Sequence, residues 1–412
     1  MPTRASTSAH SVSQRIRLNV LYAAIQAFYW MACCPIYGFG AAFLLDLGFS
    51  SVDIGMMLGV SNILAVLLQP PLSALSDADK RFSPIRIALL LNAAVLASAL
   101  LQMVLLPKGP LMAVLWTFMA TCSFMAVVFM TAVKFQIDGE GVVDFGVCRA
   151  AGSLAWGVLA SGLGFAMERF GIRLVPFSAV AASAGVLVLL AVCGRNAGRV
   201  GAQAHSPRDT AGQASTWPEF IRANPWLMVL LVGTALVYLH HSMANNFGAV
   251  LVNNVGGDNS DLGLISALSA VLEIPGMVLY SRLEKRFGAR SILAFSLLTF
   301  TMKSIALWLA ASVGQLTLAF SIQVLCYGLF MTSTVSFADQ IVRPCDLVKA
   351  QSCFTLVTVV SSILSSFVGG ALFQALGATP TLGVAAVTAA VGLAISLISI
   401  VRIKLVREEA AR

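Results

Sequence analysis

Four ionisable side chains lie within long apolar stretches of the sequence: Glu273, Lys303, His240 and His241. An ionisable group in membrane hydrocarbon is costly, so those that occur usually face a cavity and mark a path for ions or substrate. At 1.5 Å per helical residue, Glu273 lies roughly 13 Å from the basic loop after it and Lys303 roughly 20 Å from the basic loop before it. Because the two stretches are consecutive and antiparallel, we expect Glu273 and Lys303 to approach each other at mid-depth.

This pair could handle protons. A carboxyl group shielded from water and placed near an ammonium can take up and release a proton when its surroundings rearrange. We therefore predict that Glu273 is the proton-coupling residue and that Lys303 tunes it. The alternative is a static ion pair that only holds the two helices together.

A second polar group lies between Tyr238 and Phe247, in another apolar stretch. His241 and Asn245 are four residues apart and so share a helical face, whereas the adjacent residue His240 points about 100° away from His241. We predict that His241 and Asn245 contact a substrate. The alternative is that they form hydrogen bonds between helices.

Aromatic side chains in the first apolar stretch could line the same cavity, and we predict that Tyr29 contacts a ring-bearing substrate. Packing between helices or placement at the membrane interface is the alternative. The candidates for this lining are Gln26, Phe28, Tyr29, Trp30 and Tyr37.

The elements that carry these residues are predicted from composition. The 412 residues are 58% hydrophobic and only 11% charged, whereas soluble domains carry roughly 25% charged residues. A helix needs about 20 apolar residues to cross a bilayer, which predicts an all-α membrane protein with twelve transmembrane helices. The two longest, 18–45 and 224–252, are expected to tilt or project beyond the bilayer. The predicted spans are 18–45, 52–75, 85–107, 111–136, 146–168, 172–193, 224–252, 261–281, 290–311, 314–338, 347–375 and 379–402.

Residues 194–223 are polar and lack apolar periodicity, which predicts a linker between two six-helix bundles, 1–193 and 224–412. The net charge of +8 would suggest a nucleic-acid partner in a soluble protein. Here the bases lie in short loops, so the charge indicates topology rather than nucleic-acid binding. With the N-terminus inside, most of the 26 Lys and Arg residues fall on the inner side. We therefore expect a protein of the bacterial inner membrane with both termini on the cytoplasmic side.

Two loops at equivalent places in the two halves carry an acid followed by clustered bases. After the second span the residues are Asp77, Lys80 and Arg81, and after the eighth span Glu284 stands among bases that include Arg282 and Arg286. These loops resemble the loop motif of major facilitator transporters, with Ser73 in place of the leading glycine. The resemblance implies two pseudo-symmetric bundles, a role for these loops in conformational change, and a functional monomer.

The segment 145–157, at the start of the fifth span, resembles the oligosaccharide–proton symporters related to lactose permease. On that likeness Arg149 would contact substrate hydroxyls and Trp156 would stack on a ring. The segment Leu272-Glu273-Ile274-Pro275 also resembles bacterial sugar-efflux transporters, which leaves the direction of transport open.

The chain departs from the symporters at their other functional positions. The acidic substrate ligand falls on Thr131, the proton-handling histidine and glutamate fall on Gln323 and Cys326, and the eleventh-span lysine falls on Thr358. The symporter proton route therefore cannot be transferred intact. We place Gln323 among the predicted substrate-binding residues.

No motif predicts catalysis or a cofactor. The eight cysteines form no CxxC pair, and the sequence has neither a P-loop nor an HExxH motif, so we expect no metal and no ATP-driven pump. The leading prediction is proton-coupled import of a small polar solute, an oligosaccharide, glycoside or nucleoside. The alternatives are proton-driven export of sugars or drugs, a non-transporting sensor, and an intramembrane enzyme; sodium in place of protons also stays open.

Overall fold

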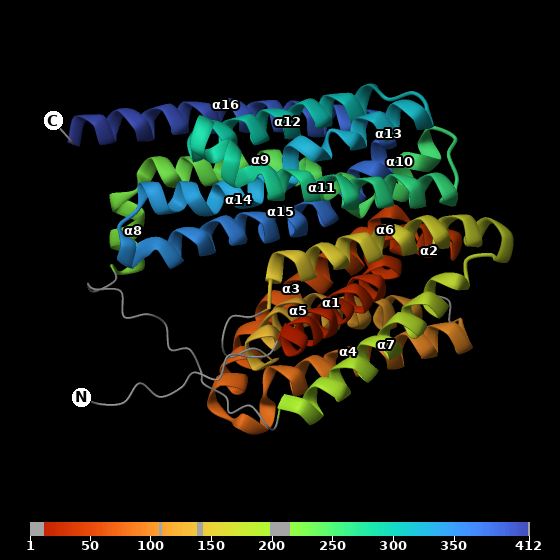
Figure 1. The fold of residues 1–412 in the computed structure, drawn as a ribbon. Helices are drawn as coiled ribbons and strands as arrows, with labels where there is room; N and C mark the ends of the chain where they lie inside the picture. Colours follow the sequence, from red (N-terminus) through yellow and green to blue (C-terminus); the bar gives the residue numbers. More distant parts are fainter. Residues whose placement is uncertain (1–11, 107–108, 138–142, 198–214, 411–412) are drawn as a thin grey trace, which may run out of the picture.

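The computed structural model describes residues 12–106, 109–137, 143–197 and 215–410 (Figure 1). Within these residues, twelve helices are long and apolar enough to cross a membrane, and each overlaps one predicted span. The chain is therefore a multi-pass membrane protein. Its helices are α1 (Val12–Cys33), α2 (Gly40–Asp46), α3 (Ser51–Ala78), α4 (Pro84–Leu105), α5 (Pro110–Ile137), α6 (Phe145–Phe170), α7 (Leu174–Ala197), α8 (Trp217–Ala223), α9 (Pro225–Asn246), α10 (Gly248–Asn254), α11 (Asn259–Phe287), α12 (Ala289–Leu309), α13 (Val313–Ser321), α14 (Gln323–Ile341), α15 (Leu347–Leu376) and α16 (Ala378–Ala410), with a π-helix η1 (Cys34–Gly38) and 3-10 turns η2 (Lys80–Phe82) and η3 (Pro344–Asp346).

The helices gather in two groups, α1–α7 and α9–α16 (Figure 1). The short helix α8 and the end of α16 lie at one end of the molecule, which we call the terminal end. The exact limits of the two predicted bundles stay a prediction, and residues 198–214 of the predicted linker lie outside the described residues.

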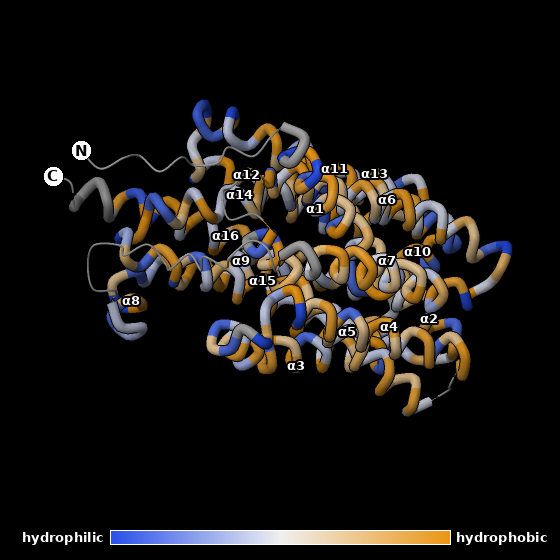
Figure 2. Tube along the Cα trace, turned by 60° about the horizontal axis from the view of Figure 1, so that its bottom comes forward, coloured by the Kyte–Doolittle hydropathy of each residue, from blue (hydrophilic) through white to orange (hydrophobic). Residues whose placement is uncertain are grey.

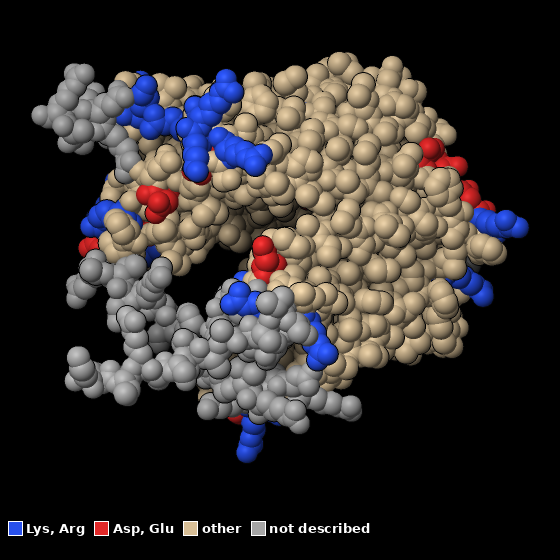
Figure 3. Space-filling view, in the orientation of Figure 1, with Lys and Arg blue, Asp and Glu red and all other residues tan. Residues whose placement is uncertain are grey.

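Hydrophilic residues concentrate toward the two ends of the helices, and hydrophobic residues fill the stretch between them (Figure 2). On the face shown in Figure 3, Lys, Arg, Asp and Glu lie at the ends, and the belt between them carries none. Such a belt is the surface that lipid tails can cover without desolvating charge.

Three of the spans are interrupted, each beside the space between the two groups. The first span passes from α1 through the π-helix η1 to α2, because Pro35 lacks the N–H group that a continuous helix needs. The seventh span breaks at Phe247 between α9 and α10, and the tenth breaks at Ile322 between α13 and α14. The two longest predicted spans are therefore each divided into shorter helices, and their tilting or projection beyond the bilayer stays a prediction.

At the end opposite the terminal end, the two groups meet through glycines. Gly164 of α6 faces Gly263 of α11, and a Cβ atom added to either would lie 3.1 Å from the Cα atom of the other. Gly55 of α3 faces Gly370 of α15 in the same way, at 3.2 Å. Small residues let helix backbones approach this closely. Figure 3 shows the surface hollowed between the groups toward the terminal end, so the molecule is closed at one end and open at the other.

At the terminal end, a buried carboxylate ties the residues just before α8 to the turn η3 before α15. Asp346 is only 2% exposed. It accepts hydrogen bonds from the Ser215 hydroxyl at 2.5 Å, from Arg343 at 2.8 Å and from Lys349 at 2.9 Å. Lys349 also donates to the Ser215 carbonyl oxygen. The cluster fixes the point at which the chain enters the second group of helices.

We expect Asp346→Ala to lower the apparent melting temperature of the detergent-solubilised protein by several degrees, because hydrogen bonds to a charged group contribute about 1.5–3 kcal/mol each. Tryptophan fluorescence during heating measures the change. The exposed Asp339 at the end of α14 provides the control, since Asp339→Asn removes a charge without removing this cluster. Equal melting temperatures for the two variants would contradict the anchoring role.

Candidate transport cavity

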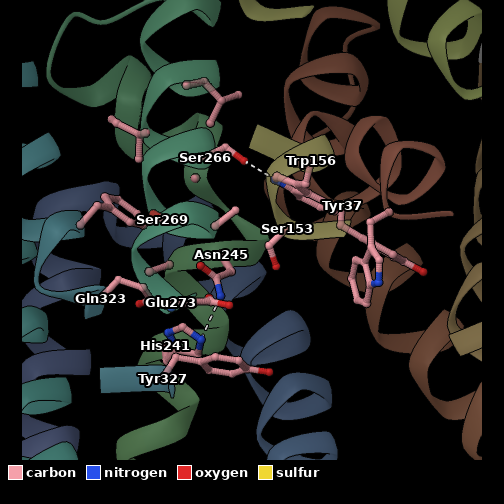
Figure 4. Close-up of a pocket in the computed structure, with 18 of the residues that line it drawn as sticks. Tyr37, Ser153, Trp156, His241, Asn245, Ser266, Ser269, Glu273, Gln323 and Tyr327 are labelled. Carbon is pink, nitrogen blue, oxygen red and sulfur yellow. Dashed lines mark hydrogen bonds between the residues drawn. The ribbon is translucent and has the colours of Figure 1, made fainter. Parts of the chain in front are cut away.

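A cavity of about 390 Å³ lies between the two groups of helices, within the range of small-molecule sites. One wall is formed by α1, η1, α5 and α6, and the other by α9, α10, α11, α13 and α14. Six of the predicted site residues line it: Arg149, Trp156, His241, Asn245, Glu273 and Gln323. Figure 4 shows the last five of them around the cavity. Tyr29 and Lys303, also predicted, do not line it.

Arg149 forms the cationic part of the first wall. Its guanidinium carbon lies 3.9 Å from the centroid of the Trp30 ring, and its Nη1 donates to the Ser153 hydroxyl at 3.0 Å. Within the described residues, no carboxylate forms an ion pair with Arg149. Arg149, Ser153 and Trp156 occupy one face of α6 because they are spaced four and three residues apart. The guanidinium therefore has donors left for an acceptor on a bound solute.

Trp156 reaches across the cavity to the second wall. Its indole Nε1 donates to the Ser266 hydroxyl of α11 at 3.0 Å (Figure 4). The bond joins the two groups of helices, so it must break if they separate here. Stacking of Trp156 on a substrate ring stays a prediction.

On the second wall, Asn245 and His241 form a hydrogen bond of 3.1 Å (Figure 4), as their four-residue spacing predicts. The Asn245 nitrogen can only donate, so His241 accepts through Nε2. The amide carbonyl oxygen of Asn245 is then left as an acceptor. His241 stacks on Tyr327, with ring centroids 5.5 Å apart. The neighbouring His240 is buried away from the cavity.

Glu273 and Lys303 come near each other but do not form the direct ion pair that was the alternative to proton coupling. Gln323 lies between them: the Lys303 ammonium donates to Gln323 Oε1 at 2.7 Å, and Gln323 Nε2 donates to Glu273 Oε1 at 2.9 Å. Lys303 is 1% exposed and its ammonium lies 4.6 Å from the centroid of the Phe320 ring. The break at Ile322 starts α14 at Gln323 and brings this side chain between α11 and α12.

The position of Tyr29 differs from our expectation. Its side chain is 2% exposed, and its hydroxyl donates to the Ser123 carbonyl oxygen at 2.9 Å in the packed interior of the first group. The adjacent Trp30 and the later Tyr37 line the cavity instead. Tyr327 also lines the cavity and was not predicted, although its spacing of four residues from Gln323 places both on the same helical face.

The predicted loop residues lie at the terminal end. Asp77, Arg81, Arg282 and Arg286 are exposed, and among the described residues none of these four belongs to an ion pair. Lys80 begins the turn η2. The two loops stand on the open side of the molecule, and their role in conformational change stays a prediction.

Solved structures with the same fold cover nearly the whole chain. The nucleoside transporter NupG superposes with a TM-score of 0.72 at 14% identity, over 94% of this chain and 98% of that one. A POT family peptide transporter gives 0.71 at 12% identity, over 94% and 97%. A bacterial homologue of the human lysosomal transporter Spinster, in an inward-facing unoccupied conformation, gives 0.66 at 14% identity, over 96% and 97%.

A search of curated protein sequences found no match. Residues 17–384 match the model described as the MFS_1 like family. With the twelve spans and the shared fold, this match identifies the chain as a member of the MFS_1 like family, a membrane transporter of the major facilitator type and not an enzyme.

Proposed function

We propose that the protein imports a small polar solute together with a proton by alternating access, in which the two groups of helices rock around a central site. The observation that carries this proposal is the cavity between the groups. One wall carries a guanidinium that no carboxylate of the described residues pairs with, and the other carries a half-buried carboxylate. Each chain holds a complete cavity, so we propose a functional monomer. The proton gradient is the proposed energy source, and coupling to sodium is the competing possibility.

We assign the terminal end to the cytoplasmic side of a bacterial inner membrane, because Lys and Arg concentrate in its loops. With this orientation the hollow opens inward. The glycine contacts then close the outer side, and the conformation corresponds to an inward-facing state.

The walls of the cavity favour a hydroxylated ring compound. Arg149 offers donors from the first wall, whereas Asn245 and Glu273 offer acceptors from the second. Aromatic side chains stand on both walls, including Trp156 and Tyr327. A sugar ring or nucleoside has hydroxyls for both walls and a face for aromatic contact. Oligosaccharides, glycosides and nucleosides are therefore the proposed substrates, and NupG, named as a nucleoside transporter, shares the fold.

Glu273 is the proposed site of the coupled proton. The carboxyl group would take up a proton on the outer side while the cavity binds a solute, and both would be released on the inner side. Because Glu273 lies on the cavity wall, the bound solute and the carboxyl proton can affect each other directly.

The test is uptake of labelled nucleosides, glycosides and oligosaccharides into proteoliposomes, with and without an inward proton gradient. We expect accumulation of one class that collapses with a protonophore. Accumulation only when the lumen is more acidic than the medium would assign proton-driven export instead. Solute binding without flux under any gradient would favour a sensor.

We expect Arg149→Lys to raise the KM for transport about 10- to 100-fold. A lysine keeps the charge but loses the planar fork that lies on Trp30 and can donate two parallel bonds, and a hydrogen bond to a charged group is worth about 1.5–3 kcal/mol. Initial uptake rates measure the change. Arg173→Lys, an exposed position, is the matched control, and equal KM values for both variants would contradict the role of Arg149.

A further inference from the structure

We infer that Gln323 is a positioning residue that links the buried Lys303 ammonium to the Glu273 carboxylate, rather than a substrate ligand. The inference rests on the proposed role of Glu273 in proton coupling. It gives Gln323 a role that differs from the substrate binding predicted from the sequence.

The two partners of Gln323 fix the direction of its amide. The Lys303 ammonium has donors only, so it must bond to the amide oxygen. The amide NH₂ group is then turned toward Glu273, and a carboxylate is the acceptor that suits it best. The two bonds of 2.7 and 2.9 Å place the dipole of Gln323 in line between the two charges, so neither bond can reverse without losing the other.

This arrangement differs functionally from an ion pair. A direct ammonium–carboxylate contact in a poorly solvated site would strongly hold the carboxyl group in its charged form. The intervening amide orients Glu273 while keeping the ammonium one side chain away. Only Oε1 of Glu273 is engaged by Gln323, and no described residue bonds to its second oxygen, which is left for a proton or a solute hydroxyl.

The backbone around the link is held by close packing of α14 on α11. A Cβ atom added to Gly328 would lie 2.6 Å from the Glu273 carbonyl oxygen, and one added to Gly276 would lie 3.2 Å from the Val324 carbonyl oxygen. Gln323 is the first residue of α14, directly after the break at Ile322. The packing therefore fixes Glu273 relative to α14, while the break lets α13 take a separate direction.

Other titratable side chains lie on the elements around the link between Lys303, Gln323 and Glu273. They are Arg149 on α6, Tyr238, His240 and His241 on α9, Lys303 on α12, and Cys326 and Tyr327 on α14. Among the described residues, Gln323 is hydrogen-bonded to both Lys303 and Glu273. Replacing Gln323 therefore removes a contact of Glu273 without removing a charge, whereas replacing a charged residue would affect all of these groups.

The experiment is a double-mutant cycle on solute exchange at equal pH on both sides, using the solute found by the uptake screen. In Gln323→Leu, the carboxylate loses a donor that favours its charged form. We expect the pH at which exchange falls to half to rise by about 1 unit, with KM at low pH changed less than about threefold. In the Glu273→Gln background, Gln323→Leu should have no further effect, because it acts through Glu273.

Two further variants keep the test decisive. Gln323→Leu leaves a buried ammonium without its acceptor and could unfold the protein. Combining Lys303→Met with Gln323→Leu removes that unpaired charge. We expect this combination, like Gln323→Leu alone, to have no further effect on the pH profile once Glu273 is replaced by glutamine. Gln102→Leu, at a fully buried glutamine in α4 that does not line the cavity, controls for the general cost of removing a buried amide and should leave the pH profile unchanged.

The outcomes separate the inference from the proposed function. A rise in KM of tenfold or more for Gln323→Leu in both backgrounds would make Gln323 a substrate ligand and overturn the inference. An unchanged pH profile in a folded Gln323→Leu protein would overturn it too. Failure of the proposed function has a different signature, since the wild-type protein would then show no proton-driven accumulation.

Discussion

Replacing Glu273 by glutamine is expected to abolish proton-driven accumulation while solute exchange continues. The amide keeps the size of the side chain and can still bond to a solute, but it cannot take up or release a proton at the pH of the cell. Uptake under an inward proton gradient should therefore stop at the external concentration. The measurement is the final internal concentration of labelled solute in proteoliposomes, together with the rate of exchange.

The exposed Asp46 at the end of α2 offers a matched control, because Asp46→Asn removes a carboxylate that does not line the cavity. This variant should accumulate solute like the wild type. Full accumulation by the Glu273→Gln protein would remove the carboxyl group from the coupling mechanism and leave it a structural role.

A tryptophan in place of Gly164 is expected to hold the outer end open and stop transport. Gly164 and Gly263 approach so closely that even a methyl group on either glycine would meet the backbone of the other helix. An indole cannot be accommodated without separating α6 from α11, and separation also breaks the bond between Trp156 and Ser266. Spin labels on the outer ends of α6 and α11 should show a longer distance, and solute binding from the outer side should persist.

Gly162 supplies the control on the same helix, because no atom lies within 4 Å of a Cβ added there. Gly162→Trp should leave both the spin-label distance and transport close to the wild type. Normal transport by Gly164→Trp would mean that the glycine contacts at this end do not control access to the cavity.

The fold was predictable because its main determinant is a one-dimensional signal. Apolar runs of about 20 residues separated by basic loops locate membrane spans without knowledge of packing. Each of the twelve helices of sufficient length overlaps a predicted span. The breaks at Phe247 and Ile322 were not predicted, since no proline stands at either residue to indicate an interruption.

The charged residues that line the cavity could be predicted from the sequence, but their hydrogen-bond partners could not. Glu273 stands out as a costly group in an apolar segment, whereas Arg149 was predicted from the resemblance of its segment to the oligosaccharide–proton symporters. Rotation about a helix axis decides which of two adjacent residues faces the cavity, and this separates Trp30 from Tyr29. The link through Gln323 depends on where α14 starts. The sequence therefore predicted that Lys303 and Glu273 lie at similar depth, but not that Gln323 stands between them.

The most direct measurement follows protons and solute together. Proteoliposomes would hold a pH-sensitive dye, with no imposed proton gradient and with the membrane potential clamped, and the solute from the uptake screen would be added outside. We expect the lumen to acidify as the solute enters through the wild-type protein, and not through Glu273→Gln. Entry of labelled solute into the wild-type liposomes with no change in internal pH would contradict proton-coupled import.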